Sequence, residues 1–121
     1  MPEKQLPHHH FQSEEAAKLS ERLGHTQDFE VVSEIFKQLS DTSRIRIFWL
    51  LCHYEECVIN ISALVEMSSP AVSHHLKQLK SSGLIVSRRE GKEVYYKAAD
   101  TEAAQLLHRT IEKMMDISCP Q

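Results

Sequence analysis

The sequence predicts a mostly helical chain that carries one β-hairpin near its C-terminal end. Apolar residues recur at helical spacing through most of the 121 residues, and only three glycines interrupt them. Residues 69–82 predict one such helix, whose apolar stripe consists of Ala71, Val72, Leu76 and Leu79. Two β-prone runs that flank a charged turn follow Gly83, which predicts a hairpin over residues 84–98.

The helix over residues 69–82 has clear start and stop signals. Ser69 is expected to be its N-cap, and Pro70 suits the first helical position because its missing N–H would have no partner there. Gly83 is expected to end the helix in the left-handed conformation. The face opposite the apolar stripe is polar and carries Ser73, His74, Lys77 and Lys80.

The first three of the four helices expected before this one follow a flexible arm over residues 1–12. Ser13 is expected to cap the first helix, which ends at Gly24. The negative charges of Glu14 and Glu15 in its first turn interact favourably with the helix dipole. The second helix is predicted from Asp28 to about residue 39. Asp41 is expected to cap a third, central helix, whose buried stripe consists of Ile45, Phe48, Leu51 and Cys52.

A short helix over residues 61–67, capped by Asn60, is predicted to turn directly into the helix over residues 69–82. Two short helices joined by a tight polar turn form a helix-turn-helix, and the basic hairpin that follows would be its wing. In a winged helix-turn-helix the second helix enters a DNA major groove while the wing reaches the neighbouring backbone.

Asp100 is expected to cap a last helix that ends at about residue 116. The first and last helices carry apolar faces beyond those that the middle core needs. Such surplus faces predict a homodimer through the N- and C-terminal helices. The domain is therefore predicted over residues 13–121, with recognition helix 69–82, wing 84–98 and dimer helix 100–116.

The charge distribution supports a DNA-binding role. The net charge is −3. Residues 69–97 nevertheless hold six basic and two acidic residues, so this segment carries +4 and the remainder −7. Attraction to phosphate is local, because salt screens it beyond about 8–10 Å. The charge of this basic segment is therefore more important for DNA binding than the net charge of the whole chain.

Other classes of protein are less favoured. No run approaches the length of a membrane span, and the N-terminus lacks an export signal, so a cytoplasmic protein without membrane contact is expected. Three cysteines form no paired framework, which fits a reducing compartment. Neither a nucleophile–base pattern nor a phosphate-binding glycine loop is present, so an enzyme is not expected. A winged-helix module that binds only proteins is an alternative, but it would not need this basic face.

Residues 30–116 resemble the ArsR/SmtB family of bacterial winged-helix repressors. The resemblance rests on LSDTSRIRIFWLL (39–51), on EECVINISALVEMSSPAVSHHLKQLKSSGLI (55–85) and on RREGKEVYYK (88–97). The resemblance implies a homodimer that binds an inverted-repeat operator in double-stranded DNA near its own promoter. An inducer would lower operator affinity and release transcription.

The same resemblance implies which residues would contact DNA: Ser69, Ser73, His74, Lys77, Arg88, Arg89 and Lys92. The recognition helix would contribute the first four, which would bind phosphates and base edges. The wing would contribute the others, which would bind the backbone or the minor groove. For the pair His74 and His75, the alternative is that one packs against the core while the other is solvated.

The inducer is harder to predict, because both family metal sites are altered. Cys57 matches the first thiolate position of a site shared with the N-terminal arm, but Ile59 and Asn60 replace further ligands. His8 and His10, or His9 between them, could supply nitrogen ligands instead. Together with Cys57 they would suit Zn²⁺ or another thiophilic divalent metal.

The second family site would match Asp100, Glu102, Lys113 and Asp116. Lys113 would repel a cation, so this site is not expected to bind zinc. His108 is expected to be solvated or to lie in the dimer seam. A thiol switch is a further alternative, in which Cys52 is buried and inert, and Cys57 and Cys119 are candidates for exposure. A non-metal inducer, or no inducer at all, is the remaining alternative.

Overall fold

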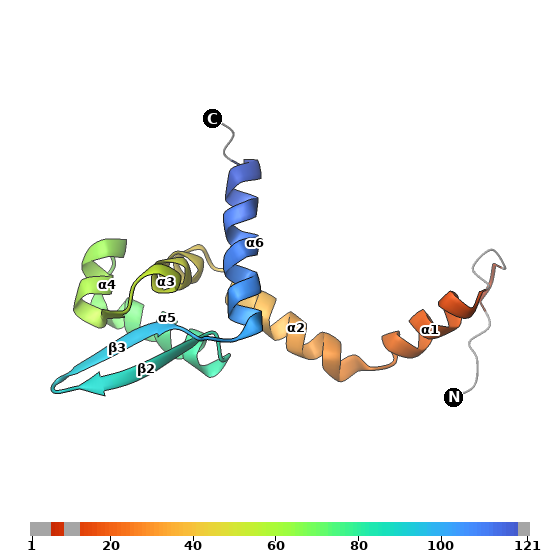
Figure 1. The fold of residues 1–121 in the computed structure, drawn as a ribbon, viewed down its shortest axis with the longest axis horizontal. Helices are drawn as coiled ribbons and strands as arrows, with labels where there is room; N and C mark the ends of the chain where they lie inside the picture. The colour runs from red at the N-terminus through yellow and green to blue at the C-terminus, as the bar shows by residue number, and fades with distance from the viewer. Residues whose placement is uncertain (1–5, 9–12, 119–121) are drawn as a thin grey trace. The chain divides into compact units, whose positions relative to one another are not determined.

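The computed structural model describes residues 6–8 and 13–118, with side chains as far as residue 116. Helices dominate this part of the chain, and a small antiparallel sheet completes it (Figure 1). The elements in chain order are α1 (Glu14–Leu23), α2 (Thr26–Gln38), α3 (Thr42–His53), β1 (Glu56–Cys57), α4 (Val58–Val65), α5 (Ser69–Ser81), β2 (Ile85–Glu90), β3 (Glu93–Ala98) and α6 (Glu102–Ser118). The predicted fold class is confirmed.

The chain divides into two compact units, residues 1–34 and residues 35–121, with the boundary inside α2. In the first unit Ser13 caps α1 as predicted, since its Oγ accepts a hydrogen bond from the backbone N–H of Ala16 at 3.1 Å. Gly24 ends that helix, also as predicted. α2 begins at Thr26, two residues before the predicted start at Asp28.

The second unit is built around α3, α4 and α5, which enclose its hydrophobic core. Asp41 caps α3 as predicted, because its Oδ1 accepts from the backbone N–H of Arg44 at 3.0 Å. This hydrogen bond is also the main reason why the pKa of Asp41 is lowered. The largest fully buried side chains are Phe48, Ile47, Ile61, Leu76, Leu79, Leu84, Ile85 and Val72. They come from α3, α4, α5, the start of β2 and the residue just before β2.

The helix-turn-helix consists of α4 and α5, and both N-caps differ from the predictions. α4 begins at Val58 with Cys57 as N-cap, so Asn60 lies inside the first turn and donates to Glu56 Oε2 at 2.9 Å. α5 is capped by Ser68, whose Oγ accepts from Ala71 N at 3.3 Å, and not by Ser69. Consecutive serines offer equivalent caps, and the chain uses the earlier one.

The turns around α5 depend on left-handed backbone conformations. Glu66 ends α4 at φ 57°, and this conformation redirects the chain toward α5. Gly83 follows α5 at φ 80°, as the sequence predicts. The N–H of Leu84 then bonds to Leu79 O at 3.1 Å, and that of Gly83 to Lys80 O at 3.0 Å. This is the pattern of a glycine-terminated helix, and it leads the chain into β2.

The sheet has the strand order β1-β3-β2, with both pairs antiparallel. β2 and β3 form the predicted hairpin, but they are longer than expected, because Arg88 and Arg89 pair with Tyr95 and Val94 instead of lying in the turn. The turn is short and contains Gly91 at φ 63°. β1 was not predicted. It pairs Cys57 with Tyr95, a contact between residues far apart in the sequence.

The start of α6 also differs slightly from the prediction. Thr101 Oγ1 accepts from the backbone N–H of Ala104 at 3.2 Å, so Thr101 rather than Asp100 satisfies this donor. Asp100 instead accepts from Gln105 Nε2 at 2.8 Å. Among the helices that the structure describes, none is long and apolar enough to cross a membrane.

Candidate DNA-binding surface and candidate metal sites

α5 is amphipathic, and its apolar side fixes which residues face outward. Val72, Leu76 and Leu79 are fully buried, because α5 packs against α3, α4 and β2. The predicted contact residues Ser69, Ser73, His74 and Lys77 are all exposed. Ser69, Ser73 and Lys77 are spaced by four residues, so they lie along one side of the helix. The helix therefore presents hydroxyl, imidazole and ammonium groups to the outside.

The paired histidines of α5 have different environments. His74 is exposed, whereas His75 is half-buried and its Nδ1 has no hydrogen-bond partner within the described part of the chain. Burial lowers the pKa of His75, and the nearby Asp41 carboxylate only partly opposes this shift. The arrangement is the one in which one histidine packs toward the core and the other is available to a ligand.

The wing presents its three predicted basic residues, but they are not equivalent. Arg88, Arg89 and Lys92 are all exposed. The Arg88 guanidinium donates from Nε and NH2 to Glu55 at 2.7–3.1 Å, also binds Glu90, and lies 4.9 Å from the ring centroid of Tyr95. These carboxylates raise the pKa of Arg88, whose hydrogen bond in turn lowers the pKa of Glu55. Arg88 therefore stays charged and already has two carboxylate partners on the wing side of the molecule.

The predicted metal ligands Cys57 and His8 lie in different units of the chain. Cys57 is only 8% exposed, so the expectation that it is exposed is wrong. It is buried because β1 pairs with β3 at this residue. His8 lies in the first unit and Cys57 in the second. His10 and Cys119 lie outside the described residues.

Cys52 fits the prediction of an inert thiol. It lies on the inner side of α3 and is half-buried. Burial, together with the negative charge of Glu112, raises the pKa of Cys52 to about 11. The thiolate is the reactive form, so this pKa keeps the side chain mainly in the less reactive thiol form at neutral pH. The other family site, from Asp100 to Asp116, has only exposed residues at its matching positions.

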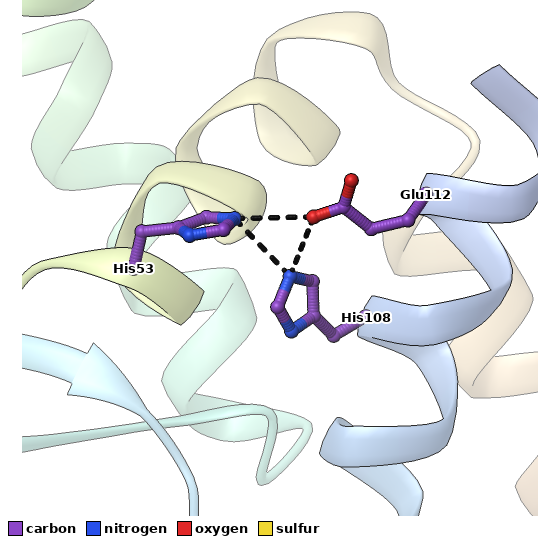
Figure 2. A group of neighbouring side chains, drawn as sticks. All are labelled: His53, His108 and Glu112. Atoms are coloured by element: carbon purple, nitrogen blue, oxygen red, sulfur yellow. Dashed lines mark hydrogen bonds and ion pairs between the residues drawn. The ribbon is translucent and has the colours of Figure 1, made fainter. Parts of the chain in front are cut away.

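A cluster that the sequence did not reveal joins the end of α3 to α6 (Figure 2). His53 Nε2 lies 3.2 Å from Glu112 Oε1 and 3.2 Å from His108 Nε2. His108 Nε2 lies 2.9 Å from the same Glu112 oxygen. The prediction that His108 is solvated or lies in the dimer seam did not include these two neighbours. The spacing of His108 and Glu112, four residues apart, was a readable signal, but His53 is 55 residues from His108.

Trp49 completes the surroundings of this cluster. Its Nε1 donates to Glu112 Oε1 at 3.2 Å, and its ring lies 4.6 Å from that of His53, centroid to centroid. Hydrogen bonds from His108, His53 and Trp49 lower the pKa of Glu112, so its carboxylate is ionised at neutral pH. The cluster thus offers two imidazoles and one oriented carboxylate.

Comparison with known proteins agrees with the winged helix-turn-helix fold. The family model described as bacterial regulatory protein, arsR family, matches residues 41–87, which run from the N-cap of α3 into β2. A cadmium resistance transcriptional regulatory protein CadC homolog of Staphylococcus aureus is 35% identical over 88 residues, covering 72% of this chain and 73% of that protein. A transcriptional repressor SmtB homolog of Synechocystis is 35% identical over 85 residues, covering 70% and 64%.

A solved structure extends the match to most of the chain. The homodimeric winged helix-turn-helix DNA-binding domain from Mycobacterium bovis, a possible ArsR-family transcriptional regulator, superposes with a TM-score of 0.66 at 30% identity. The match covers 87% of this chain and 88% of that domain. From its sequence and its winged helix-turn-helix fold, the chain belongs to the ArsR family of bacterial regulatory proteins.

Proposed function

We propose that this protein is a cytoplasmic, homodimeric transcriptional repressor that binds an inverted-repeat operator and is released by a metal ion. The observation that carries this proposal is the exposed polar face of α5 beside the basic wing. A helix of this kind fits a major groove, and the charge concentrated on α5 and the wing attracts phosphate. No catalytic activity is part of the proposal.

Each contact residue has a role set by its chemistry. Ser69, Ser73 and His74 near the start of α5 bind phosphates and base edges, and Lys77 binds phosphate. On the wing, Arg89 and Lys92 bind the DNA backbone or the minor groove. Arg88 contributes less, because Glu55 and Glu90 already match its charge.

The homodimer is supported by apolar side chains that remain exposed. On α1 these are Leu19 and Leu23, which are 53% and 66% exposed. On α6 they include Leu106 and Met114, which are 56% and 60% exposed. The Mycobacterium bovis domain is homodimeric, and a two-fold dimer presents two recognition helices to an inverted repeat.

A metal inducer is supported by the relatives, which include regulators of cadmium resistance and of arsenic resistance. The ligand set Cys57, His8 and His10 stays a prediction. Cys57 would have to reach the metal from a buried position. The variant Cys57→Ser tests whether this thiol is needed for release from DNA by the metal ion, because intact release in the variant would exclude Cys57 as a necessary ligand.

The test is fluorescence anisotropy of the reduced, full-length protein on DNA from its own upstream region. The protein is first titrated with chelator present, and then with Zn²⁺, Co²⁺, Ni²⁺, Cd²⁺ or arsenite added singly. We expect tight binding with chelator, and at least tenfold weaker binding with one ion, which corresponds to about 1.4 kcal/mol of coupling. Equal affinity for the upstream DNA and for a shuffled sequence would contradict the operator. Indifference to every ion would contradict the metal inducer.

A further inference from the structure

We infer that His53, His108 and Glu112 form a binding site for a first-row divalent cation at the junction of α3 and α6. His53 is the last residue of α3, while His108 and Glu112 lie one turn apart on α6 (Figure 2). The ligand atoms that the three side chains offer all lie within 4.8 Å of one another. No residue of this cluster belongs to the ligand sets that the sequence suggested.

The distances match those of a coordination shell. The three contacts between ligand atoms are 2.9, 3.2 and 3.2 Å. With bonds of about 2.0–2.1 Å to the metal, neighbouring ligands are about 3.3–3.4 Å apart in a tetrahedron and about 2.9 Å apart in an octahedron. One cation can therefore lie against all three atoms without large movement of either helix.

Hydrogen bonds satisfy only two of the three contacts in this triangle. An ionised Glu112 brings no proton, and each imidazole brings at most one proton at Nε2. If both histidines donate that proton to Glu112 Oε1, no proton is left between their two nitrogens, which lie 3.2 Å apart. If one histidine nitrogen lacks its proton, the lone pair of that nitrogen faces the carboxylate oxygen. A cation accepts all three lone pairs at once, which removes the conflict.

The surroundings are those of a metal site. The Trp49 N–H holds the carboxylate oxygen of Glu112, and ligating carboxylates are commonly oriented by such outer hydrogen bonds. The side chains of His53, His108 and Glu112 are 37%, 27% and 43% exposed, so an ion can enter from solvent. A pocket of about 290 Å³ lies beside the two histidines, and it has room for water as a further ligand.

The ligand chemistry selects the ion. Two imidazoles and a carboxylate without sulfur suit Zn²⁺, Co²⁺ or Ni²⁺, whereas Cd²⁺ and arsenite favour thiolates. This inference rests on the proposed function in one respect, that the bound ion is the inducer. α3 packs against both α5 and α6, so an ion that ties α3 to α6 acts on a helix that supports the recognition helix. The ion shifts DNA affinity only if the DNA-bound and DNA-free forms of the protein bind the ion with different affinities.

The binding site can be tested without DNA, because the chain has one tryptophan and it adjoins the cluster. Paramagnetic Co²⁺ or Ni²⁺ added to the apoprotein should quench Trp49 fluorescence and saturate at one ion per protomer. His108→Asn and Glu112→Gln should raise the dissociation constant at least tenfold. The exposed control His25→Asn should keep the wild-type value. Circular dichroism verifies that each variant is folded.

The Co²⁺ complex also reports its own ligands. We expect d–d absorption without a thiolate-to-cobalt charge-transfer band, and no change of spectrum in Cys57→Ser. A thiolate band that this variant abolishes would overturn the inference, and so would equal Co²⁺ affinity in His108→Asn and the wild type.

Anisotropy on the upstream DNA then separates the two proposals. Metal release that survives in His108→Asn and Glu112→Gln would support the proposed function and overturn this site as the inducer site. Saturable quenching that leaves DNA affinity unchanged would support the cation site and overturn its role in induction.

Discussion

Two arginines adjacent in the sequence have different environments on the wing. Arg88 binds Glu55 and Glu90 and lies over Tyr95. Arg89 is the next residue on β2, and a strand directs successive side chains to opposite faces. Sequence proximity therefore does not make the two residues equivalent in DNA binding.

At this scale we predict that the two single variants differ in salt dependence. Arg89→Ala should reduce the slope of log affinity against log salt by about 0.9, as expected when one phosphate interaction is removed. Arg88→Ala should reduce it by less than half of that, because its charge is already matched by two carboxylates. Anisotropy titrations over a salt series measure both slopes. A slope that changes equally in the two variants would show that the ion pair between Arg88 and Glu55 opens when DNA binds.

At the scale of elements, the packing of α5 against the start of α3 places a histidine in a half-buried position. His75 on α5 interacts with Asp41, the N-cap of α3, and with Arg44 and His74. Burial lowers the pKa of His75 from its ordinary value of 6.5. The neutral form is thus preferred in the folded protein, while the unfolded chain binds the proton more readily.

We predict that His75 makes the protein less stable as the pH falls. Its contribution is fully present above about pH 6.5 and is lost as the pH drops toward its lower folded pKa. The lowered pKa of Asp41 acts in a separate window, below its ordinary value of 3.8. Urea unfolding between pH 7.5 and 5 should therefore show a smaller loss of stability in His75→Phe than in the wild type. His25→Asn, at an exposed position, should lose stability with falling pH as the wild type does. The same loss of stability in His75→Phe and the wild type would contradict the role of His75.

At the scale of the whole molecule, the apolar residues left exposed on α1 and α6 bear on the proposed dimer. Leu106 and Met114 are exposed apolar side chains of α6 and lie about a quarter of a turn apart around that helix. Ala104 belongs to the core of the second unit, and Ile111 packs against that core. The helix thus carries apolar side chains that its own unit does not bury.

We predict that Leu106→Glu combined with Met114→Glu converts the dimer into monomers. Burying one such side chain contributes about 1.5–3 kcal/mol, so the dimer dissociation constant should rise about hundredfold or more. Sedimentation velocity measures the change, and operator affinity should fall with it. Gln105→Lys, at an exposed position on the side of α6 opposite Met114, should stay dimeric. A dimer that persists in the double variant would place the interface elsewhere.

The sequence was sufficient for the features that depend on local chemistry. Helical periodicity predicted the core residues Val72, Leu76 and Leu79, and Gly83 predicted the end of α5. The caps Ser13 and Asp41 were also readable, because a capping side chain bonds to a backbone N–H three residues away. Where two polar residues stood side by side, as with Ser68 and Ser69, the sequence could not choose between them.

Tertiary structure alone decided the features that join distant segments. β1 exists because Cys57 pairs with Tyr95, and this pairing buries the thiol that the sequence suggested was exposed. Arg88 is matched by Glu55, a residue 33 positions away. The triangle of His53, His108 and Glu112 arises only when the end of α3 packs beside α6. Periodicity and capping act over a few residues, whereas ligand geometry and charge pairing depend on how the elements pack, which no short-range pattern encodes.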